Sequence, residues 1–358
     1  MSINHTFVGR PYPPLAIADL GSIASKLERD SDSLSDSSIF ITGGSGLIGK
    51  WLVQSLLHAD KIMGLGIQIG LMCRDPTRLS TELPDLANDS RITYYRSDIR
   101  EASAELISGH YDFFIHAATS VADPGPAYDT LDVCIRGTQA AIDLAVKMRC
   151  SRFLLLSSGA VYGNGQWPDS GLTESDQGFL DFSNGASAYA YGKRCAELLC
   201  MQAADQHPIE FVIARCFAML GPYLALDRHY AVGNFIGAAL RRNPITIKGD
   251  GTPIRSYLYM SDVAQHLLGI LIRGSNRTAY NVGSNRPLSI KAIAERVNEV
   301  LGAGVEVRVE GRSLHGPHAS QYLPSVLKIR NDLALDQTVG IDEAILSTAM
   351  WYQKWILH

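Results

Sequence analysis

The chain lacks several features by which particular classes of protein are recognised. Only 19% of its 358 residues are charged and the net charge is −4, so it has no basic excess of the kind a nucleic-acid-binding surface carries. No apolar run reaches the roughly 18 residues that a membrane-spanning helix needs, and residues 1–37 contain no hydrophobic signal core. We therefore expect a soluble cytoplasmic protein with neither nucleic acid nor membrane as a partner.

The cysteines show no pattern that indicates a disulfide framework or a metal site. None of the six forms a Cys-x-x-Cys pair, and none is spaced with histidine as metal ligands are. Most lie in apolar stretches, which predicts buried, reduced thiols and no bound metal.

The first 37 residues are expected to form an N-terminal extension without chemistry of its own. Within it, residues 15–27 have the pattern of a short amphipathic helix, which we expect to pack on the body of the protein or on a partner subunit. The run at 31–38 is rich in serine and aspartate and predicts a polar linker.

From Ser38 onward the chain alternates between apolar, strand-like runs and helical segments. Strands are expected at 39–42, 67–73, 91–98, 111–119, 153–158 and 209–217, with helices at 47–59, 128–148 and 190–204. This order predicts an α/β fold with a Rossmann-type, doubly wound parallel sheet and helices on both faces. We assign residues 38–220 to this dinucleotide-binding domain, with some segments of 256–285 returning to it. Residues 221–358 are assigned mainly to a smaller C-terminal α/β domain that binds substrate.

A glycine-rich turn joins the first expected strand to the first expected helix. It reads T-G-G-S-G-L-I-G over residues 42–49. Such glycines allow a tight turn, a close approach of the backbone to a pyrophosphate and close packing of helix on sheet. The helix N-terminus then offers free N–H groups to the phosphates. We expect a nicotinamide dinucleotide to contact Gly43, Gly46, Leu47 and Ile48.

The end of the second expected strand bears on the choice between NAD and NADP. Arg74 stands where a guanidinium could bind a 2′-phosphate, which favours NADP(H), whereas Asp75 keeps NAD(H) as the alternative because a carboxylate binds the free ribose. Further cofactor contacts are expected where the next two strands end, at Asp98, Ile99, Ala117 and Ala118. His116, at the end of the same strand as Ala117, is expected to be a packing or hydrogen-bonding residue.

Tyr189 and Lys193 are separated by four positions in a segment with helical character. Residues at that spacing share one face of a helix, so the ammonium would lie beside the phenol and lower its pKa from about 10. Ser158 closes an apolar strand about thirty residues upstream and could hydrogen-bond the same substrate oxygen. Together with the glycine turn, these three residues predict an oxidoreductase in which Tyr189 is the acid or base.

These segments resemble the extended short-chain dehydrogenase/reductase family, and more narrowly its NAD(P)-dependent nucleotide-sugar epimerase/dehydratase branch. The resemblance runs from about residue 38 to about residue 285 and includes TGGSGLIG, SSGAVYG and YAYGK. It implies that Arg255 grips the substrate diphosphate and that Asn234 contacts the nucleotide. It also implies a homodimer, since subunits of this branch usually pair through the helix that carries the tyrosine and its neighbour.

The chain departs from the pattern of the 4,6-dehydratases of that branch. Those enzymes carry an Asp-Glu pair directly after the serine or threonine, whereas Gly159 and Ala160 stand here and neither can transfer a proton. We therefore expect no elimination of water. A 4-epimerase or a 4-ketoreductase needs only the serine, the tyrosine and the cofactor, and both remain open.

Four positions leave the substrate unidentified. Ala218 and Cys134 replace asparagines of the family pattern, so contacts to sugar or phosphate are expected to be rearranged. His229, in the loop after G-P-Y, is a candidate substrate contact and additional acid or base, against the simpler interpretation of an exposed loop histidine. Tyr162 could face the substrate or the core.

Two other functions are weighed against a nucleotide-sugar enzyme. An NADPH-dependent reductase of a non-nucleotide ketone is suggested by the R-D-P segment at 74–76, which also resembles flavonoid-type reductases. The second alternative is a catalytically silent cofactor-binding protein, and the intact Ser158, Tyr189 and Lys193 count against it.

Overall fold

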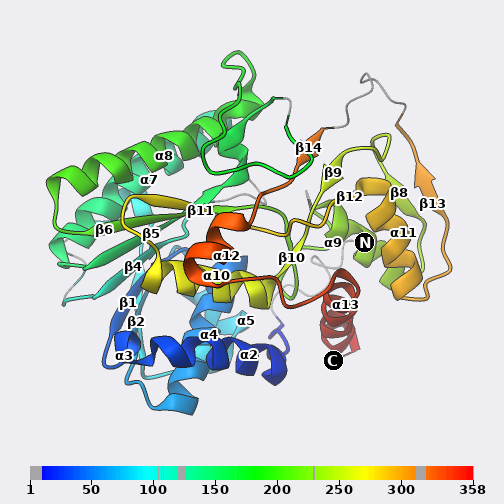
Figure 1. The fold of residues 1–358 in the computed structure, drawn as a ribbon. Coiled ribbons are helices and arrows are strands. Elements are labelled where there is room, and N and C mark those ends of the chain that lie inside the picture. The colour runs from blue at the N-terminus through cyan, green and yellow to red at the C-terminus, as the bar shows by residue number, and fades with distance from the viewer. Residues whose placement is uncertain are drawn as a thin grey trace.

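A computed structural model places a seven-stranded parallel sheet at the centre of the part of the chain that it describes (Figure 1). The described residues are 10–103, 105, 107, 109–119, 126–165, 167–228, 230–311 and 320–357. The strand order is β11-β6-β5-β4-β1-β2-β3, and every neighbouring pair is parallel. The strands are β1 (Ser38–Thr42), β2 (Gln68–Cys73), β3 (Ile92–Arg96), β4 (Phe113–His116), β5 (Arg152–Ser158), β6 (Glu210–Cys216) and β11 (Thr278–Val282). The predicted Rossmann-type fold is therefore confirmed.

Helices cover both faces of this sheet because the strands are apolar on both sides. Helices α4 (Leu47–Met63) and α10 (Met260–Arg273) contact each other on one face, and α7 (Ala127–Lys147) pairs with α8 (Ala188–Gln206) on the other. Along β5, Leu154 and Leu156 belong to the first core while Phe153 and Leu155 belong to the second. This alternation follows from the two-residue repeat of a strand.

The C-terminal half folds largely beside the sheet but sends two elements back to it. Strand β11 extends the sheet next to β6, and α10 packs on α4. The remaining elements form small paired strands and helices on the side at which the sheet strands end (Figure 1). They are β7 (Met219–Leu220), α9 (Ala231–Leu240), β8 (Ile245–Ile247), β9 (Ile254–Arg255), β10 (Leu258–Tyr259), β12 (Leu288–Ser289), α11 (Ile290–Val300), β13 (Val307–Val309), β14 (Gln321–Tyr322), α12 (Leu327–Leu333) and α13 (Ile341–Leu357).

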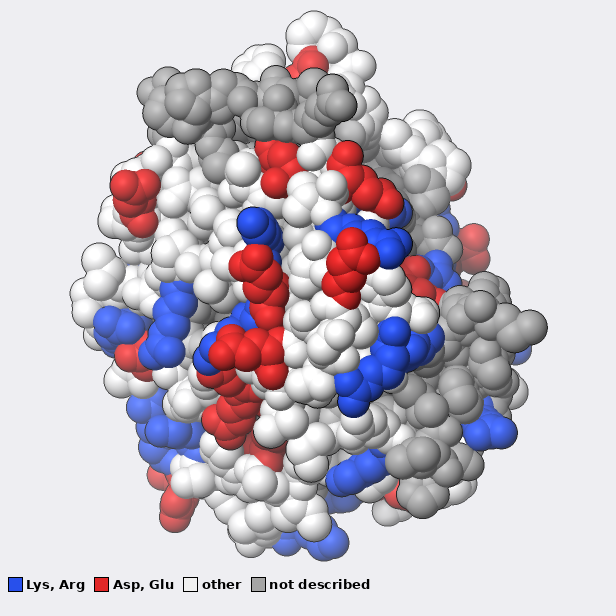
Figure 2. Space-filling model, turned by 90° about the vertical axis from the view of Figure 1, so that its right-hand side faces the viewer, with Lys and Arg blue, Asp and Glu red and all other residues white. Residues whose placement is uncertain are grey.

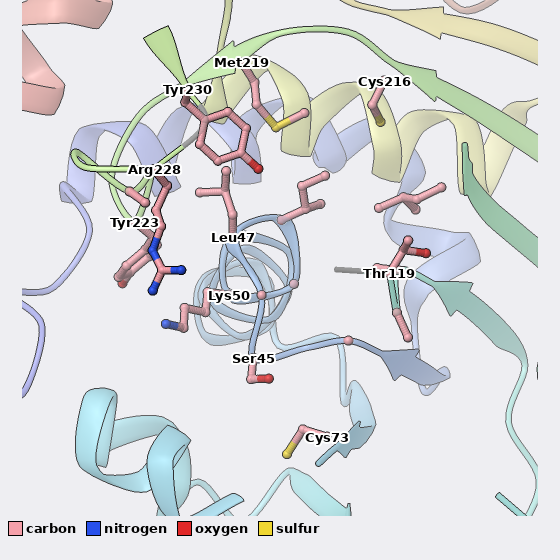
Figure 3. Close-up of a pocket in the computed structure, with 18 of the residues that line it drawn as sticks. Ser45, Leu47, Lys50, Cys73, Thr119, Cys216, Met219, Tyr223, Arg228 and Tyr230 are labelled. Carbon is pink, nitrogen blue, oxygen red and sulfur yellow. The ribbon is translucent and has the colours of Figure 1, made fainter. Parts of the chain in front are cut away.

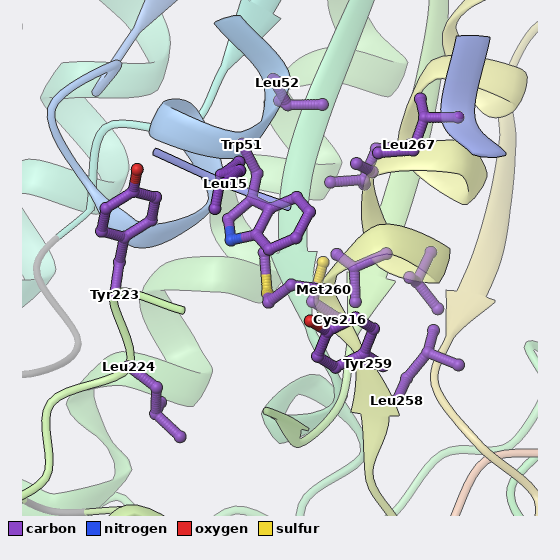
Figure 4. Packing of buried hydrophobic residues seen from close by; sticks show 14 of the residues in the cluster. Leu15, Trp51, Leu52, Cys216, Tyr223, Leu224, Leu258, Tyr259, Met260 and Leu267 are labelled. Atoms are coloured by element: carbon purple, nitrogen blue, oxygen red, sulfur yellow. The ribbon is translucent and has the colours of Figure 1, made fainter. Parts of the chain in front are cut away.

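Trp51 of α4 joins the two halves of the molecule. Its indole is fully buried, lies edge-on to Tyr259 at 6.1 Å between ring centroids, and donates a hydrogen bond to the carbonyl of Pro222 at 3.2 Å. Figure 4 shows it among Leu15, Met260 and Tyr259. A large aromatic side chain in this position buries extensive apolar area, so it fixes the second half against the cofactor-binding half.

The N-terminal extension is more structured than a linker. Helix α2 (Ile17–Leu27) packs on α4 and α10, as an amphipathic helix on the body of the protein would. The expected polar linker at 31–38 is wrong in part, because helix α3 (Ser31–Leu34) occupies its start. Leu34 is fully buried and Asp30 pairs with Arg273, so an apolar anchor and an ion pair hold a segment whose composition indicates a loop.

Charges of both signs are mixed on the side that carries α11, α13 and β13, which Figure 2 shows. Arg296 of α11 pairs with Asp342 of α13, and Arg308 of β13 pairs with Glu306. None of the helices in the described ranges is long and apolar enough to cross a membrane. All six cysteines are free, and within the described residues no group of His, Cys, Asp and Glu could hold a metal ion.

Candidate active site

A cleft of about 1660 Å³ opens where the sheet strands end against the C-terminal half. A single small ligand occupies a pocket of roughly 300–1,000 Å³, so this cleft has room for a dinucleotide and a second molecule. Every cofactor contact predicted from the sequence lines it. Figure 3 looks into the cleft and shows Ser45, Leu47 and Lys50 from the turn and start of α4, Cys73 from β2, and Met219, Tyr223, Arg228 and Tyr230 from the segment after β6.

The glycine turn is shaped for a pyrophosphate. Gly43 has φ +73°, and a Cβ there would lie 2.7 Å from the carbonyl of Ala117. A Cβ on Gly49 would lie 2.5 Å from the carbonyl oxygen of Gly43, so larger residues would push the turn out of this shape. Gly46 caps α4 without any side-chain hydrogen bond, and no acidic residue occupies the first turn. The free N–H groups and helix dipole therefore fit the phosphates of a dinucleotide.

Both acidic residues near the expected ribose and adenine positions have partners within the protein. Asp75 accepts a hydrogen bond from the backbone N–H of Arg78 at 3.0 Å and so caps the short helix α5 (Pro76–Glu82). Asp98 binds the side chain of Arg100, which lowers the pKa of its carboxyl; Arg74, exposed at the end of β2, adds a smaller effect of the same sign. Both carboxylates still line the cleft.

Ser158, Tyr189 and Lys193 come together in the cleft as the sequence predicts. Ser158 ends β5, and its hydroxyl accepts a hydrogen bond from the N–H of Ala160 at 3.1 Å. Lys193, one helical turn after Tyr189 on α8, places its Nζ 5.9 Å from the centroid of that ring. The ammonium donates to Thr119 Oγ1 at 2.9 Å and to the carbonyl of Leu156 at 2.7 Å.

The electrostatics of this pair differ from the expectation that Lys193 lowers the pKa of the phenol. Burial raises the pKa of Tyr189, and the opposing influence is a hydrogen bond from Ser158. Burial also lowers the pKa of Lys193. Since desolvation disfavours the charged form of each group, the Tyr189 phenol stays protonated. An oxidised nicotinamide bound in the cleft would add a positive charge that favours deprotonation of this phenol.

A buried polar network fixes α8 against the sheet. Glu197, one turn after Lys193, accepts from Ser157 Oγ at 2.5 Å and pairs with Arg215 at 2.8 Å. Arg215 also donates to the hydroxyl of Tyr162 at 3.1 Å, and that hydroxyl donates to Asn281 Oδ1 at 2.6 Å. Tyr162 is thus a core residue of this network and does not face the substrate.

His116 lies beneath the site and does not act in it. It is buried, its Nδ1 lies 2.8 Å from Thr42 Oγ1, and burial together with Lys193 lowers its pKa to about 3. A neutral, hydrogen-bonded imidazole agrees with the packing role expected from the sequence.

Arg255 faces the cleft without a carboxylate partner in the described part of the chain. Its Nη1 donates to the carbonyls of Ile254 at 2.7 Å and Ser320 at 3.1 Å, and burial lowers its pKa. None of the described acidic residues forms an ion pair with Arg255, although such a pair would be the simpler explanation for an arginine here. A partly desolvated guanidinium of this kind is suited to an anionic ligand such as a diphosphate.

Of the two remaining predicted substrate contacts, only Asn234 can be placed, and it lies outside the cleft. Its Nδ2 donates to the carbonyl of Arg228 at 2.8 Å, and its Oδ1 is buried without a partner among the described residues. Asn234 therefore supports the loop that faces the cleft. His229 lies outside the described residues.

Sequence patterns did not identify Tyr322, Tyr12 and Lys50, which also line the cleft. Tyr322 comes from a two-residue strand outside every motif, and Tyr12 from the extension. Lys50 directly follows the last glycine of the turn, is buried, and lies 2.5 Å from Glu82 Oε2. Only Lys50, in the first turn of the helix that follows the glycine turn, had a local pattern that could have indicated it.

The sequence is similar to a known enzyme family and to several of its members. The sequence model of the NAD dependent epimerase/dehydratase family matches residues 39–283. UDP-glucuronic acid decarboxylase 6 of Arabidopsis thaliana is 29% identical over 344 residues, which cover 96% of this chain and 94% of that protein. The dTDP-glucose 4,6-dehydratase of Streptomyces niveus is 25% identical over 326 residues, covering 88% of this chain and 92% of the relative.

The fold also matches solved structures. The Bacillus cereus UDP-glucuronic acid 4-epimerase in complex with UDP-glucuronic acid and NAD superposes with a TM-score of 0.75 at 23% identity, over 89% of this chain and 99% of that one. The UDP-glucose 4-epimerase of Thermotoga maritima, solved with UDP-glucose, gives a TM-score of 0.73 at 19% identity, over 89% and 99%. The family match, the glycine turn and the Ser158–Tyr189–Lys193 site agree: the chain belongs to the NAD dependent epimerase/dehydratase family, whose members are enzymes that use a nicotinamide cofactor.

Proposed function

We propose that the protein catalyses oxidation or reduction at one carbon of a nucleoside-diphosphate sugar, as a 4-epimerase or a 4-ketoreductase. The observation that carries the proposal is the meeting of Ser158, Tyr189 and Lys193 beside two residues, Gly159 and Ala160, that cannot transfer a proton. Such a site has one strong acid or base directed at one oxygen. It is suited to removing or adding a proton at a hydroxyl, and not to elimination of water.

Each of the three residues has a distinct task at the reacting oxygen. Tyr189 takes the proton from a sugar hydroxyl or returns it, and Ser158 holds the same oxygen by a hydrogen bond. Lys193 is fixed by Thr119 and Leu156 and lines the cleft, where it would hold the ribose of the cofactor. When bound, the nicotinamide accepts a hydride from the carbon or returns one to it.

The substrate class follows from Arg255 and from the named relatives. Arg255 is a partly buried cation without an acidic partner among the described residues, which favours a diphosphate. The curated relatives are named for UDP-glucuronic acid and dTDP-glucose, and two structural neighbours were solved with UDP-sugars. A reductase of a non-nucleotide ketone would have no use for this arginine, so it is the weaker alternative.

We infer that the dinucleotide is NADP(H). Arg74 is exposed at the end of β2, while Asp75 already caps α5 through one carboxylate oxygen, so a 2′-phosphate would meet a cation there. The description of the family as NAD dependent supports NAD(H) instead. Mass spectrometry of the ligands released from the purified, denatured protein separates the two by the mass of one phosphate.

One assay decides between epimerase and reductase. An epimerase keeps its dinucleotide through purification and interconverts sugars without added NADPH, whereas a reductase consumes NADPH in proportion to product. The substrates for this test are UDP-glucose, UDP-galactose, UDP-glucuronic acid and chemically prepared UDP-4-keto sugars. Tyr189→Phe should abolish turnover while the protein still binds its dinucleotide. Turnover that survives this substitution would exclude the proposed acid/base role.

We also propose that the protein is a cytoplasmic homodimer. The six free cysteines agree with a reducing compartment. Tyr128 on α7 and Leu198 on α8 are large apolar side chains with 79% and 61% of their surface exposed, and Phe182, just before α8, is 86% exposed. Exposed apolar side chains on a helix pair are what an isologous interface between two copies would bury.

A further inference from the structure

Tyr322 connects the two parts of the cleft that hold opposite ends of the proposed substrate. Strand β14 runs parallel to β9, with Tyr322 in register with Arg255. The centroid of the Tyr322 ring lies 5.7 Å from the guanidinium carbon of Arg255 and 4.6 Å from the ring centroid of Phe217. An aromatic face attracts a guanidinium at this distance, so Tyr322 helps to orient Arg255.

The hydroxyl of Tyr322 reaches the catalytic serine. It donates to the carbonyl of Cys216 at 3.4 Å, and Cys216 is the residue of β6 in register with Ser158 on β5. Burial raises the pKa of both Tyr322 and Tyr189, whereas the side chain of Ser158 lowers the pKa of both. The three hydroxyls therefore lie close together, with Ser158 in the middle.

Tyr322 also fills the space beside Ser158. A Cβ added to Gly159 would lie 2.7 Å from the hydroxyl oxygen of Tyr322 and 2.8 Å from the ring of Phe217. Non-bonded atoms essentially never approach a Cβ so closely, so residue 159 cannot carry a side chain while Tyr322 holds this position. The glycine after the catalytic serine and the tyrosine on β14 are thus two parts of one arrangement.

We propose that Tyr322 is a positioning residue for the reaction at Tyr189, because its hydroxyl orients Ser158 and its ring orients Arg255. This inference rests on the proposed function, since it assigns Ser158 to the reacting oxygen and Arg255 to the diphosphate. Burial raises the pKa of Tyr322 to about 12. Tyr322 therefore remains a phenol at neutral pH and donates a hydrogen bond, leaving the proton transfer to Tyr189.

The kinetic test compares Tyr322→Phe with a matched control. Tyr322→Phe should lower kcat roughly 10- to 100-fold while KM and dinucleotide content change little, because a misplaced donor weakens the transition state without removing a binding group. Tyr94→Phe removes a similarly hydrogen-bonded hydroxyl on β3, outside the cleft, and should leave kcat unchanged. Equal effects of the two substitutions would overturn the proposal.

A double-substitution cycle separates action through Ser158 from a general structural effect. If Tyr322 acts by orienting Ser158, Tyr322→Phe should cause little further loss of kcat in a Ser158→Ala background, so the two effects are not additive. Multiplicative losses would show that Tyr322 acts independently of Ser158 and would contradict the proposal. Thermal unfolding of each variant shows whether a loss of kcat is caused by reduced stability of the protein.

A third measurement does not depend on any substrate. The protein is labelled with ¹³C at the Cζ atom of its tyrosines and studied by NMR. The substitutions Tyr189→Phe and Tyr322→Phe identify the resonances of these two tyrosines. Ser158→Ala should then shift both resonances. A Tyr322 resonance unaffected by Ser158→Ala would exclude the shared hydrogen bond. If the unsubstituted protein converts none of the UDP-sugars, the proposed function fails, and this spectrum still decides whether Tyr322 and Ser158 are linked.

Discussion

Burial acts in opposite senses on the two titratable groups of the site. It raises the pKa of Tyr189 above its ordinary value of 10.0 and lowers the pKa of Lys193, because desolvation disfavours the charged form of each group. The hydroxyl of Ser158 is the group that opposes this effect at Tyr189. Tyr189 is therefore held as a phenol that can donate its proton. The positive charge of an oxidised cofactor would help it to accept a proton from the substrate.

The two half-reactions should consequently differ in their response to pH. Oxidation requires the Tyr189 phenolate, whose fraction rises with pH everywhere below the raised pKa, so its single-turnover rate should increase by up to about tenfold per pH unit. Reduction uses the phenol, which is already fully populated, so its rate should stay flat from neutral pH upward. Stopped-flow absorbance of the nicotinamide measures both rates. An oxidation rate independent of pH would show that Tyr189 is not the base.

The crowding around Gly159 should prevent this site from being converted into that of a 4,6-dehydratase. Installing the acidic pair of a 4,6-dehydratase by Gly159→Asp with Ala160→Glu should yield no elimination of water, because Tyr322 and Phe217 fill the space at position 159. Overpacking should also lower stability by about 1–3 kcal/mol. Ala160→Glu alone is the control and should be milder. Mass spectrometry of the products checks the result, and a product lighter by one water would contradict this account of the site.

At the scale of elements, the segment before α2 ties the two halves of the cleft together. The N–H of Tyr12 donates to the carbonyl of Glu82 at the end of α5 at 2.8 Å. Its ring lies 4.8 Å from that of Trp355 and 5.1 Å from that of Tyr223, measured between centroids. Lys50 Nζ lies 4.6 Å from the same ring. The extension thus closes one edge of the cleft across the start of the phosphate-binding helix.

Tyr12→Ala should therefore release the dinucleotide faster, by roughly tenfold, which corresponds to about 1.4 kcal/mol. It should also reduce the free energy of unfolding by about 1–3 kcal/mol through the lost aromatic contacts. The fluorescence of reduced dinucleotide, followed after dilution, measures its release. Ile17→Ala, at a 78% exposed position of α2, is the control and should change neither quantity. Unchanged release from the Tyr12 variant would limit the segment to a structural role.

The sequence predicted those elements whose residues repeat with a clear period. Strands such as β5 and the long helices α4 and α8 were expected within a few residues of their observed bounds. Strands of two or three residues, such as β9 and β14, are too short to show a period and are stabilised by partners far along the chain. For the same reason the three residues proposed to act in catalysis could be selected from their spacing on one helix and one strand, whereas Tyr322 could not.

At the scale of the whole molecule, the site depends on chain segments that are distant in sequence. The dinucleotide would contact residues of the first half, while Arg255 and Tyr322 come from the second half and face the same cleft. Strand β11 and helix α10 return to the sheet and, with Trp51, hold the halves together. A substrate that bridges Arg255 and Ser158 would add a further connection, so its binding should raise the cooperativity of unfolding of the two halves.

The pair α7 and α8 presents the apolar surface on which a dimer would form. Leu198→Glu places a charge at a 61% exposed position of α8, and it should convert the expected homodimer to a monomer because a buried, unpaired carboxylate costs several kcal/mol at an interface. Ile62→Glu, at a 60% exposed position at the end of α4, is the matched control and should leave the dimer intact. Sedimentation velocity over a range of concentrations measures both. A monomeric unsubstituted protein, or a dimer unaffected by Leu198→Glu, would exclude this surface as the interface.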